Sequence, residues 1–240
     1  VNPRACNETN LNYLPATNKK TIAVIGAGPA GLAFSEIAAL RGHQVDLFEA
    51  SDQIGGQFNL AKQIPGKEEF HETIRYFSTM LRKNGVRINL NKKVQPIDLI
   101  SKKYDDVIVS TGVSARSLDI PGSDEKIVIS YIDAIKNTDK IGKKVVLIGA
   151  GGIGFDLAEL LSHGKKNPST NIDDFAEQWG IDFTNHPRGG VTGITSKASK
   201  SEREIYLLQR KVTPLGIALG KTTGWTHRLS LRKKEIKMLK

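Results

Sequence analysis

A glycine-rich hexapeptide, GAGPAG at residues 26–31, lies between two apolar segments near the start of the chain. Residues 21–25 are apolar and β-branched, which predicts a buried parallel strand, and residues 32–40 have the apolar spacing of a helix. A glycine turn in this position is typical of dinucleotide-binding units, because the backbone can approach a pyrophosphate and the helix N-terminus attracts it. We therefore expect cofactor contacts from Gly26, Gly28, Pro29, Ala30 and Gly31.

An acidic residue follows the next predicted strand. Residues 44–48 form a second apolar segment, and Glu49 directly follows them. This acid comes about 20 residues after the glycine turn, where dinucleotide-binding folds place a carboxylate that binds ribose hydroxyls. The alternative interpretation is a glycine-rich turn followed by a solvated glutamate at the end of a strand.

The same arrangement of strand, glycine turn and helix occurs a second time. Residues 143–148 predict a strand, GAGGIG follows at residues 149–154, and residues 155–162 predict a helix. Two such units predict an α/β protein with two Rossmann-like dinucleotide-binding domains. The expected contacts at the second turn are Gly149, Gly151, Gly152, Ile153 and Gly154.

A basic pair follows the strand expected beside the second turn. Residues 163–201 are rich in Gly, Lys, Asn, Pro and Ser and predict an insertion, after which residues 204–208 supply the strand. Arg210 and Lys211 then replace the usual acid, and such a pair can bind the 2′-phosphate of NADPH. A solvated pair is the alternative. Trp225 either stacks on a flavin or nicotinamide ring or belongs to the core.

Weaker patterns predict the remaining elements. They are helices over residues 67–83, over 172–179 and up to Lys234 with Thr223 as its cap, and strands over 86–90, 92–94 and 104–110. The last of these strands is apolar enough to be buried.

The composition places few further limits on the function. The net charge is +10, but no nucleic-acid-binding motif accompanies it, so we expect a solvated basic surface and no nucleic-acid partner. No apolar run is long enough to span a membrane, and no signal peptide is visible. The single cysteine, Cys6, and the histidine spacing predict neither a disulfide framework nor a metal site, which favours the cytoplasm.

Several positions resemble those of flavoprotein oxidoreductases with two dinucleotide domains. An acid followed after five residues by paired glycines recurs in these proteins, which favours FAD at the first site and implies contacts from Gly55, Gly56 and Gln57. The run DDVIVSTG at residues 105–112 resembles the point where the chain leaves the FAD domain for an inserted NAD(P)H domain. The resemblance implies further FAD contacts from Val94, Thr111 and Gly112. We therefore expect a linker arm over residues 1–18, an FAD-binding domain over 19–112 and an NADPH-binding domain over 113–240.

Longer segments resemble one family more specifically. VNPRAC at residues 1–6, IGGQFNLAKQIPGKEEF at 54–70, LLQRK at 207–211 and LGKTTGW at 219–225 resemble the bacterial NADPH-dependent 2,4-dienoyl-CoA reductases. The resemblance covers essentially the whole chain.

This resemblance implies a module that passes hydride from NADPH to FAD, with no catalytic acid or base of its own. In the family's full protein, an FMN-containing barrel and a 4Fe–4S cluster receive the electrons and reduce the dienoyl-CoA during β-oxidation of unsaturated fatty acids. The chain begins with Val1 and ends at Lys240, so we expect an incomplete fragment that binds neither FMN nor the cluster. Cys6 is not expected to be a cluster ligand.

Two other functions stay open at this point. One is a module of another flavin oxidoreductase of the enoate-reductase or trimethylamine-dehydrogenase type. The other is a non-enzymatic dinucleotide-binding or electron-transfer module that docks on a partner.

Overall fold

The computed structural model describes residues 4–116, 118–164, 167–183 and 193–240, which form two compact units. The first unit contains the chain up to residue 61 together with residues 69–118, and the second contains residues 62–68 and 119–240. Each has its own parallel sheet, as expected for an α/β protein with two dinucleotide-binding domains. Within the described ranges, no helix has both the length and the apolar character needed to cross a membrane.

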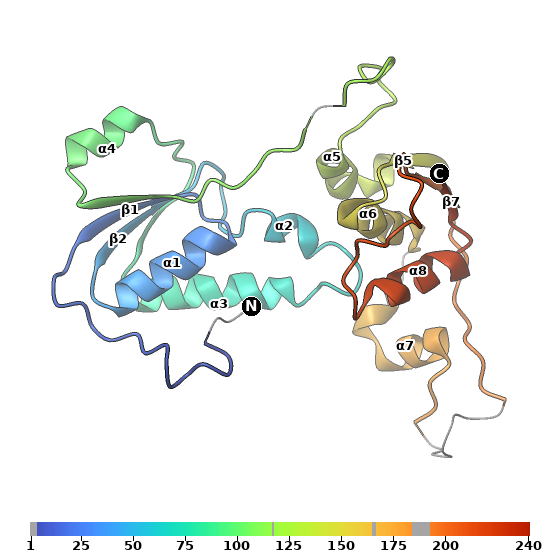
Figure 1. The fold of residues 1–240 in the computed structure, drawn as a ribbon, viewed down its shortest axis with the longest axis horizontal. Helices are drawn as coiled ribbons and strands as arrows, with labels where there is room; N and C mark the ends of the chain where they lie inside the picture. The colour runs from blue at the N-terminus through green and yellow to red at the C-terminus, as the bar shows by residue number, and fades with distance from the viewer. Residues whose placement is uncertain (1–3, 117, 165–166, 184–192) are drawn as a thin grey trace. The chain divides into compact units, whose positions relative to one another are not determined.

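The first unit contains a four-stranded parallel sheet in the order β3-β2-β1-β4, with helices α1 and α3 on one face (Figure 1). Its elements are β1 (Thr21–Ile25), α1 (Pro29–Leu40), β2 (Gln44–Phe48), α2 (Phe58–Ala61), α3 (Phe70–Lys83), β3 (Arg87–Asn89), α4 (Pro96–Lys102) and β4 (Asp106–Val109). Because β1 lies between β2 and β4, the glycine turn that follows it lies at an interior position of the sheet's carboxyl edge. This confirms the predicted strand over residues 21–25.

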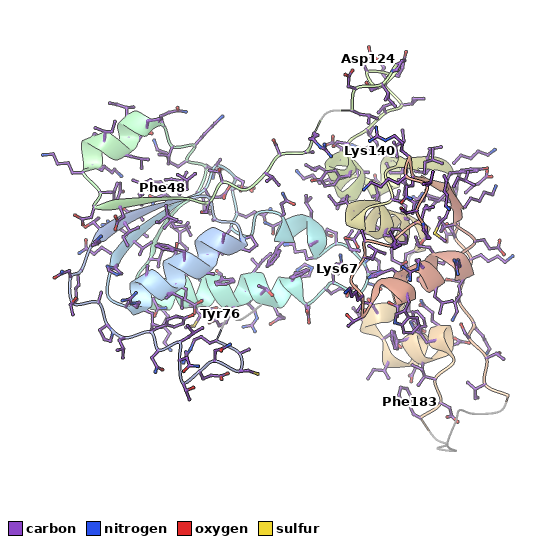
Figure 2. The ribbon with its side chains drawn as sticks, viewed as in Figure 1. Phe48, Lys67, Tyr76, Asp124, Lys140 and Phe183 are labelled. Carbon is purple, nitrogen blue, oxygen red and sulfur yellow. The ribbon has the colours of Figure 1, made fainter. Side chains whose placement is uncertain are left out.

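The core of the first unit lies between the sheet and helices α1 and α3. Val24, Leu32, Leu47 and Leu81 are fully or almost fully buried there. Their burial follows from the sequence, because alternate residues of each strand and one face of each helix are apolar. Phe48 on β2 and Tyr76 on α3 can be located in Figure 2.

The second unit contains a three-stranded parallel sheet in the order β5-β6-β7. Its elements are α5 (Tyr131–Lys136), η1 (Thr138–Lys140), β5 (Lys144–Ile148), α6 (Gly152–Ser162), η2 (Pro168–Thr170), α7 (Ile172–Trp179), β6 (Glu204–Leu208), α8 (Gly224–Lys233) and β7 (Lys237–Leu239). Phe155 and Leu161 of α6 pack with Ile205 and Leu207 of β6 and with Leu231 of α8. The predicted insertion between α6 and β6 contains α7. β5 nevertheless pairs with β6 in parallel.

Two predictions are wrong: the strand over residues 92–94 and the first three residues of the helix over 67–83. Residues 92–94 form no strand, and α4 follows instead, with Pro96 in its first turn and the Asp98 carboxylate accepting from the Gln95 N–H at 2.9 Å. Helix α3 begins at Phe70 rather than at residue 67, because the preceding residues are engaged in the second unit, where Lys67 pairs with Asp156 at 2.6 Å. Lys67 is labelled in Figure 2.

The prediction that residues 104–110 form a buried strand is also wrong. β4 is shorter and lies at the edge of its sheet, where its side chains alternate between half-buried and exposed. Val107 and Val109 are exposed, at 42% and 74%. An apolar run cannot by itself distinguish a strand covered on both faces from an edge strand covered on one.

Candidate dinucleotide-binding sites

The first glycine turn has the backbone geometry that only glycine allows. Gly26 has φ +104°, and a Cβ there would lie 2.5 Å from the carbonyl oxygen of Ser110 on the neighbouring strand. A Cβ at Gly31 would overlap the carbonyl oxygen of Gly26, so this glycine lets α1 pack against the turn. A Cβ at Gly28 would meet nothing within 4 Å. The absence of a side chain at Gly28 therefore leaves open space at the N-terminus of α1, which fits a pyrophosphate.

Glu49 is fixed against this turn. One of its carboxylate oxygens accepts from the Ala27 N–H at 2.8 Å, and the other accepts from the Ser51 N–H and hydroxyl, both at 2.9 Å. Burial opposes ionisation, but these hydrogen bonds outweigh it and hold the pKa of Glu49 below its usual value. The side chain is thus an ionised acceptor held at the turn, with lone pairs left for ribose hydroxyls. No motif in the sequence indicated the role of Ser51.

The paired glycines lie directly against the first turn. The Gly55 N–H donates to the Ala27 carbonyl at 2.8 Å, and a Cβ at Gly56 would lie 2.9 Å from the Cα of Gly28. Both residues have positive φ, +114° and +51°. The expected FAD contacts at 55–56 and at 26–31 are therefore brought together in one backbone surface. The Gln57 amide, next in the chain, donates to the Val113 carbonyl at 3.3 Å.

The end of β4 completes this surface. The Ser110 hydroxyl donates to the carbonyls of Ile25 and Gly26, both at 3.0 Å, and thereby ties β4 to the turn. Thr111 and Gly112 follow at the same edge of the sheet, and Gly112 has φ +75°. Sequence reasoning missed Ser110, although its position at the end of the strand beside β1 could have indicated it.

The loop that contains Val94 lies beside Glu49. The Asn91 N–H donates to the Ser51 carbonyl and the Lys92 N–H donates to the Glu49 carbonyl, both at 2.8 Å. These hydrogen bonds place the start of the loop next to the acid, two residues before Val94. The role of Val94 in contacting adenine stays a prediction.

The second glycine turn repeats the geometry of the first. Gly149 has φ +116°, and its N–H donates to the Leu208 carbonyl at 2.9 Å. A Cβ at Gly154 would overlap the Gly149 carbonyl oxygen, whereas Cβ atoms at Gly151 and Gly152 would meet nothing within 4 Å. Open space again lies at the N-terminus of a helix, here α6. Ile153, in the first helical turn of α6, is half exposed.

Arg210 and Lys211 lie at the same edge of the second sheet as this turn. They follow β6, which pairs in parallel with β5, and the hydrogen bond from Gly149 to Leu208 joins the ends of the two strands. Both side chains are exposed, and neither has an ion-pair partner among the residues that the structure describes. An unpaired basic pair beside a glycine turn fits an anionic group on a bound dinucleotide.

The structure separates two expectations for α8. Trp225 is 56% exposed and its indole N–H donates to the Thr222 carbonyl at 3.0 Å, so it does not belong to the core. Its stacking on a cofactor ring stays a prediction.

Thr223 occupies the N-cap position of α8, but its side chain makes no capping hydrogen bond, so the prediction that it caps the helix is wrong. Its backbone dihedrals are helical rather than extended, which turns the hydroxyl away from the first amides.

Comparison with known proteins identifies the family. A family model described as pyridine nucleotide-disulphide oxidoreductase matches residues 20–238, nearly the whole chain. The chain belongs to the pyridine nucleotide-disulphide oxidoreductase family. Membership of this family implies an oxidoreductase module that binds FAD and NAD(P)H. Each of the two units contains one glycine turn between a strand and a helix, the position at which dinucleotide-binding folds contact a pyrophosphate.

Relatives of this oxidoreductase module are much longer proteins. A metal reductase of Desulforamulus reducens is 30% identical, over 100% of this chain and 35% of that protein. A cinnamate reductase of Clostridium sporogenes is 31% identical, over 66% of this chain and 24% of that protein. A solved structure of 2-naphthoyl-CoA reductase with 2-naphthoyl-CoA matches with a TM-score of 0.76 and 29% identity, over 99% of this chain and 31% of that one. The chain therefore spans about a third or less of these relatives.

The second unit of this oxidoreductase module also contains a buried charged cluster that the sequence did not predict. The Lys234 ammonium pairs with Glu159 at 2.6 Å and lies 3.0 Å from Nε2 of His163, and the Ser230 hydroxyl donates to Glu159 at 2.9 Å. The side chains of Lys234, His163 and Glu159 are 2%, 10% and 12% exposed. Together with Phe175 and Trp179 of α7, part of the cluster lines a cavity of about 140 Å³. In the described residues, no group of three or more His, Cys, Asp or Glu side chains could hold a metal ion.

We expect the second unit to lose stability as the pH falls from 7 towards 5. Burial and the neighbouring Lys234 charge lower the pKa of His163, while Glu159 and Glu68 oppose them less strongly. The unfolded chain therefore takes up a proton that the folded one resists, which favours unfolding below the ordinary histidine pKa of about 6.5. Urea unfolding at pH 7, 6 and 5 measures this loss. His163→Gln should flatten the dependence, and an equally steep one in that variant would contradict the assignment.

Proposed function

We propose that this chain is the NADPH-to-FAD module of a 2,4-dienoyl-CoA reductase that acts in the β-oxidation of unsaturated fatty acids. Bound NADPH supplies a hydride and bound FAD accepts it. The chain's own residues bind and orient the two dinucleotides, so no acid or base is needed from them. The observation that carries the proposal is the exposed Arg210–Lys211 pair, which has no ion-pair partner among the described residues and lies at the same edge of the second sheet as the glycine turn. It favours a donor that carries a 2′-phosphate.

The first unit is proposed to hold FAD. Open backbone at Gly28, the paired glycines packed on it and the ionised Glu49 support this assignment. The proposed contacts also include Gln57, Val94, Thr111 and Gly112. Mixing the purified chain with FAD and separating free flavin tests it, and anaerobic NADPH should then bleach the flavin absorbance. Retained flavin that NADPH leaves coloured would support a passive binding module instead.

The substrate class rests on sequence resemblance and on relatives. A metal reductase, a cinnamate reductase and a 2-naphthoyl-CoA reductase share this module, so one module serves several acceptors. We propose that the complete gene product adds an FMN barrel and a 4Fe–4S cluster and acts in the cytoplasm. An assay of that product with NADPH and either a 2,4-dienoyl-CoA or cinnamate tests the choice. Faster reduction of cinnamate would favour the enoate-reductase type.

Replacing Arg210 and Lys211 together by alanine should raise the KM for NADPH by about 100-fold, because each charge-assisted hydrogen bond to a phosphate contributes about 1.5–3 kcal/mol, of which solvent exposure removes part. The KM for NADH should change less than about twofold, since NADH has no 2′-phosphate. Flavin reduction by each donor, followed by absorbance, gives both values.

The matched control also removes two positive charges, but elsewhere in the second unit. Lys136→Ala with Lys140→Ala changes α5 and η1. Arg203, just before β6, donates to the Thr138 carbonyl of η1 at 3.0 Å, so η1 lies near the amino ends of the strands, opposite to the glycine turn. Lys140 is labelled in Figure 2. The control should leave both KM values unchanged. Equal effects of the two double variants would mean that overall charge, and not a 2′-phosphate site, attracts the donor.

A further inference from the structure

The loop that carries the basic pair is closed by one side chain. The carboxamide nitrogen of Gln209 donates to the Lys211 carbonyl at 2.8 Å and to the Thr213 carbonyl at 2.7 Å. An amide NH₂ has two donors, so both are used across the loop. Because the two partners are carbonyl oxygens, the nitrogen rather than the oxygen of the amide must face them.

The backbone of Gln209 is tied to the sheet at the same time. Its N–H donates to the Leu239 carbonyl of β7 at 3.0 Å, and its side chain is half buried. Val212, at the centre of the loop, is 85% exposed, so little packing restrains the backbone there. Gln209 thus connects the rigid end of β6 to a loop that has few other restraints.

We propose that Gln209 is a positioning residue, which fixes the turn at Arg210 and Lys211 so that both cations face one 2′-phosphate. The inference rests on the proposed NADPH function. Two cations on a loose loop would lose conformational freedom on binding, whereas a loop already closed by its own hydrogen bonds loses less. Gln209 itself needs no contact with the ligand. Its effect should therefore appear only for ligands that carry the 2′-phosphate.

The test is calorimetric titration of the 240-residue chain with adenosine 2′,5′-bisphosphate and with 5′-AMP. Gln209→Met keeps the length of the side chain and removes both donors. We expect it to weaken binding of the bisphosphate by about 10-fold, because the loop loses both hydrogen bonds that close it. Binding of 5′-AMP should change less than twofold. Thr213→Val, which removes only a hydroxyl 3.5 Å from the amide, is the matched control and should change neither.

A second variant and a second readout guard against a general structural effect. Gln209→Asn restores an amide donor on a shorter side chain and should bind the bisphosphate more tightly than Gln209→Met. Trypsin should cleave after Arg210 or Lys211 faster in Gln209→Met than in the parent chain. Unchanged bisphosphate binding in Gln209→Met, an equal loss for both ligands, or an Asn variant no better than the Met variant would each overturn the inference.

The outcome also separates this inference from the function on which it rests. The NADPH proposal fails if the parent chain does not prefer the bisphosphate over 5′-AMP and the Arg210→Ala, Lys211→Ala variant binds both as before. The positioning role proposed for Gln209 then fails as well. If that preference is present and depends on the basic pair while Gln209→Met retains it, only the role of Gln209 is overturned.

Discussion

Gly154→Val should destabilise the second unit by more than about 4 kcal/mol. A Cβ at this position overlaps the Gly149 carbonyl oxygen and touches Leu207 of β6, so the helix, the turn and the strand cannot all keep their places. Overpacking of a buried site typically costs 1–3 kcal/mol, and a backbone atom that cannot move aside places the change in the range above about 4 kcal/mol. Dinucleotide binding at the second turn should be lost with it.

The chain supplies its own reporter for this measurement. Both tryptophans, Trp179 and Trp225, belong to the second unit, so fluorescence-monitored urea unfolding follows that unit alone. The control is Gly152→Ala in the same turn, where an added Cβ meets nothing within 4 Å and alanine favours the start of α6. It should unfold no earlier than the parent chain. A Gly154→Val transition at the parent midpoint would show that the turn can rearrange.

The glycine turns could be predicted from the sequence because their requirements are local. Gly26 and Gly149 need positive φ, and Gly31 and Gly154 leave no room for a side chain beside the preceding turn. The positive φ and the contact between the last and the first glycine of each turn depend on residues within six positions of one another, although Ser110 and Leu207 add contacts from distant strands. A strand, a turn and a helix therefore carry their own signal, and both predicted units are present.

Predictions failed where distant residues decide the local structure. Residues 67–69 have a helical pattern, yet Lys67 is held by Asp156, far along the chain, and the helix begins later. The strand predicted over 92–94 is absent, and a capped helix, whose start is marked by Pro96 and Asp98, follows these residues. Those two residues were visible in the sequence, so this error was avoidable, whereas the first was not.

The buried cluster around Glu159 was beyond any local pattern. Glu159 on α6 and His163 at the C-cap of that helix are four residues apart, which resembles an ordinary solvated helix pair. Lys234, more than 70 residues later, lies in a basic segment that predicts a solvated surface. Only the packing of α6 against α8 buries all three, and this contact has no counterpart in sequence spacing.

Lys234→Met should destabilise the second unit by about 3–5 kcal/mol, the loss usually seen when one partner of a buried ion pair is removed. Glu159 would keep the Ser230 hydroxyl as a donor, but its charge would lie uncompensated in the interior. Burial already lowers the pKa of Lys234, and the attraction of Glu159 only partly opposes that shift, so the pair is costly to desolvate even when it is intact. Tryptophan fluorescence during urea unfolding measures the change.

The double variant distinguishes the charge from the shape of the side chain. Glu159→Gln combined with Lys234→Met removes both charges and should recover most of the lost stability, because replacing a buried pair is often close to neutral. Arg232→Met, on the exposed side of the same helix, should shift the transition by less than about 0.5 kcal/mol. If the double variant is as unstable as Lys234→Met alone, then packing of the lysine stem, rather than the stranded carboxylate, stabilises the contact between α6 and α8.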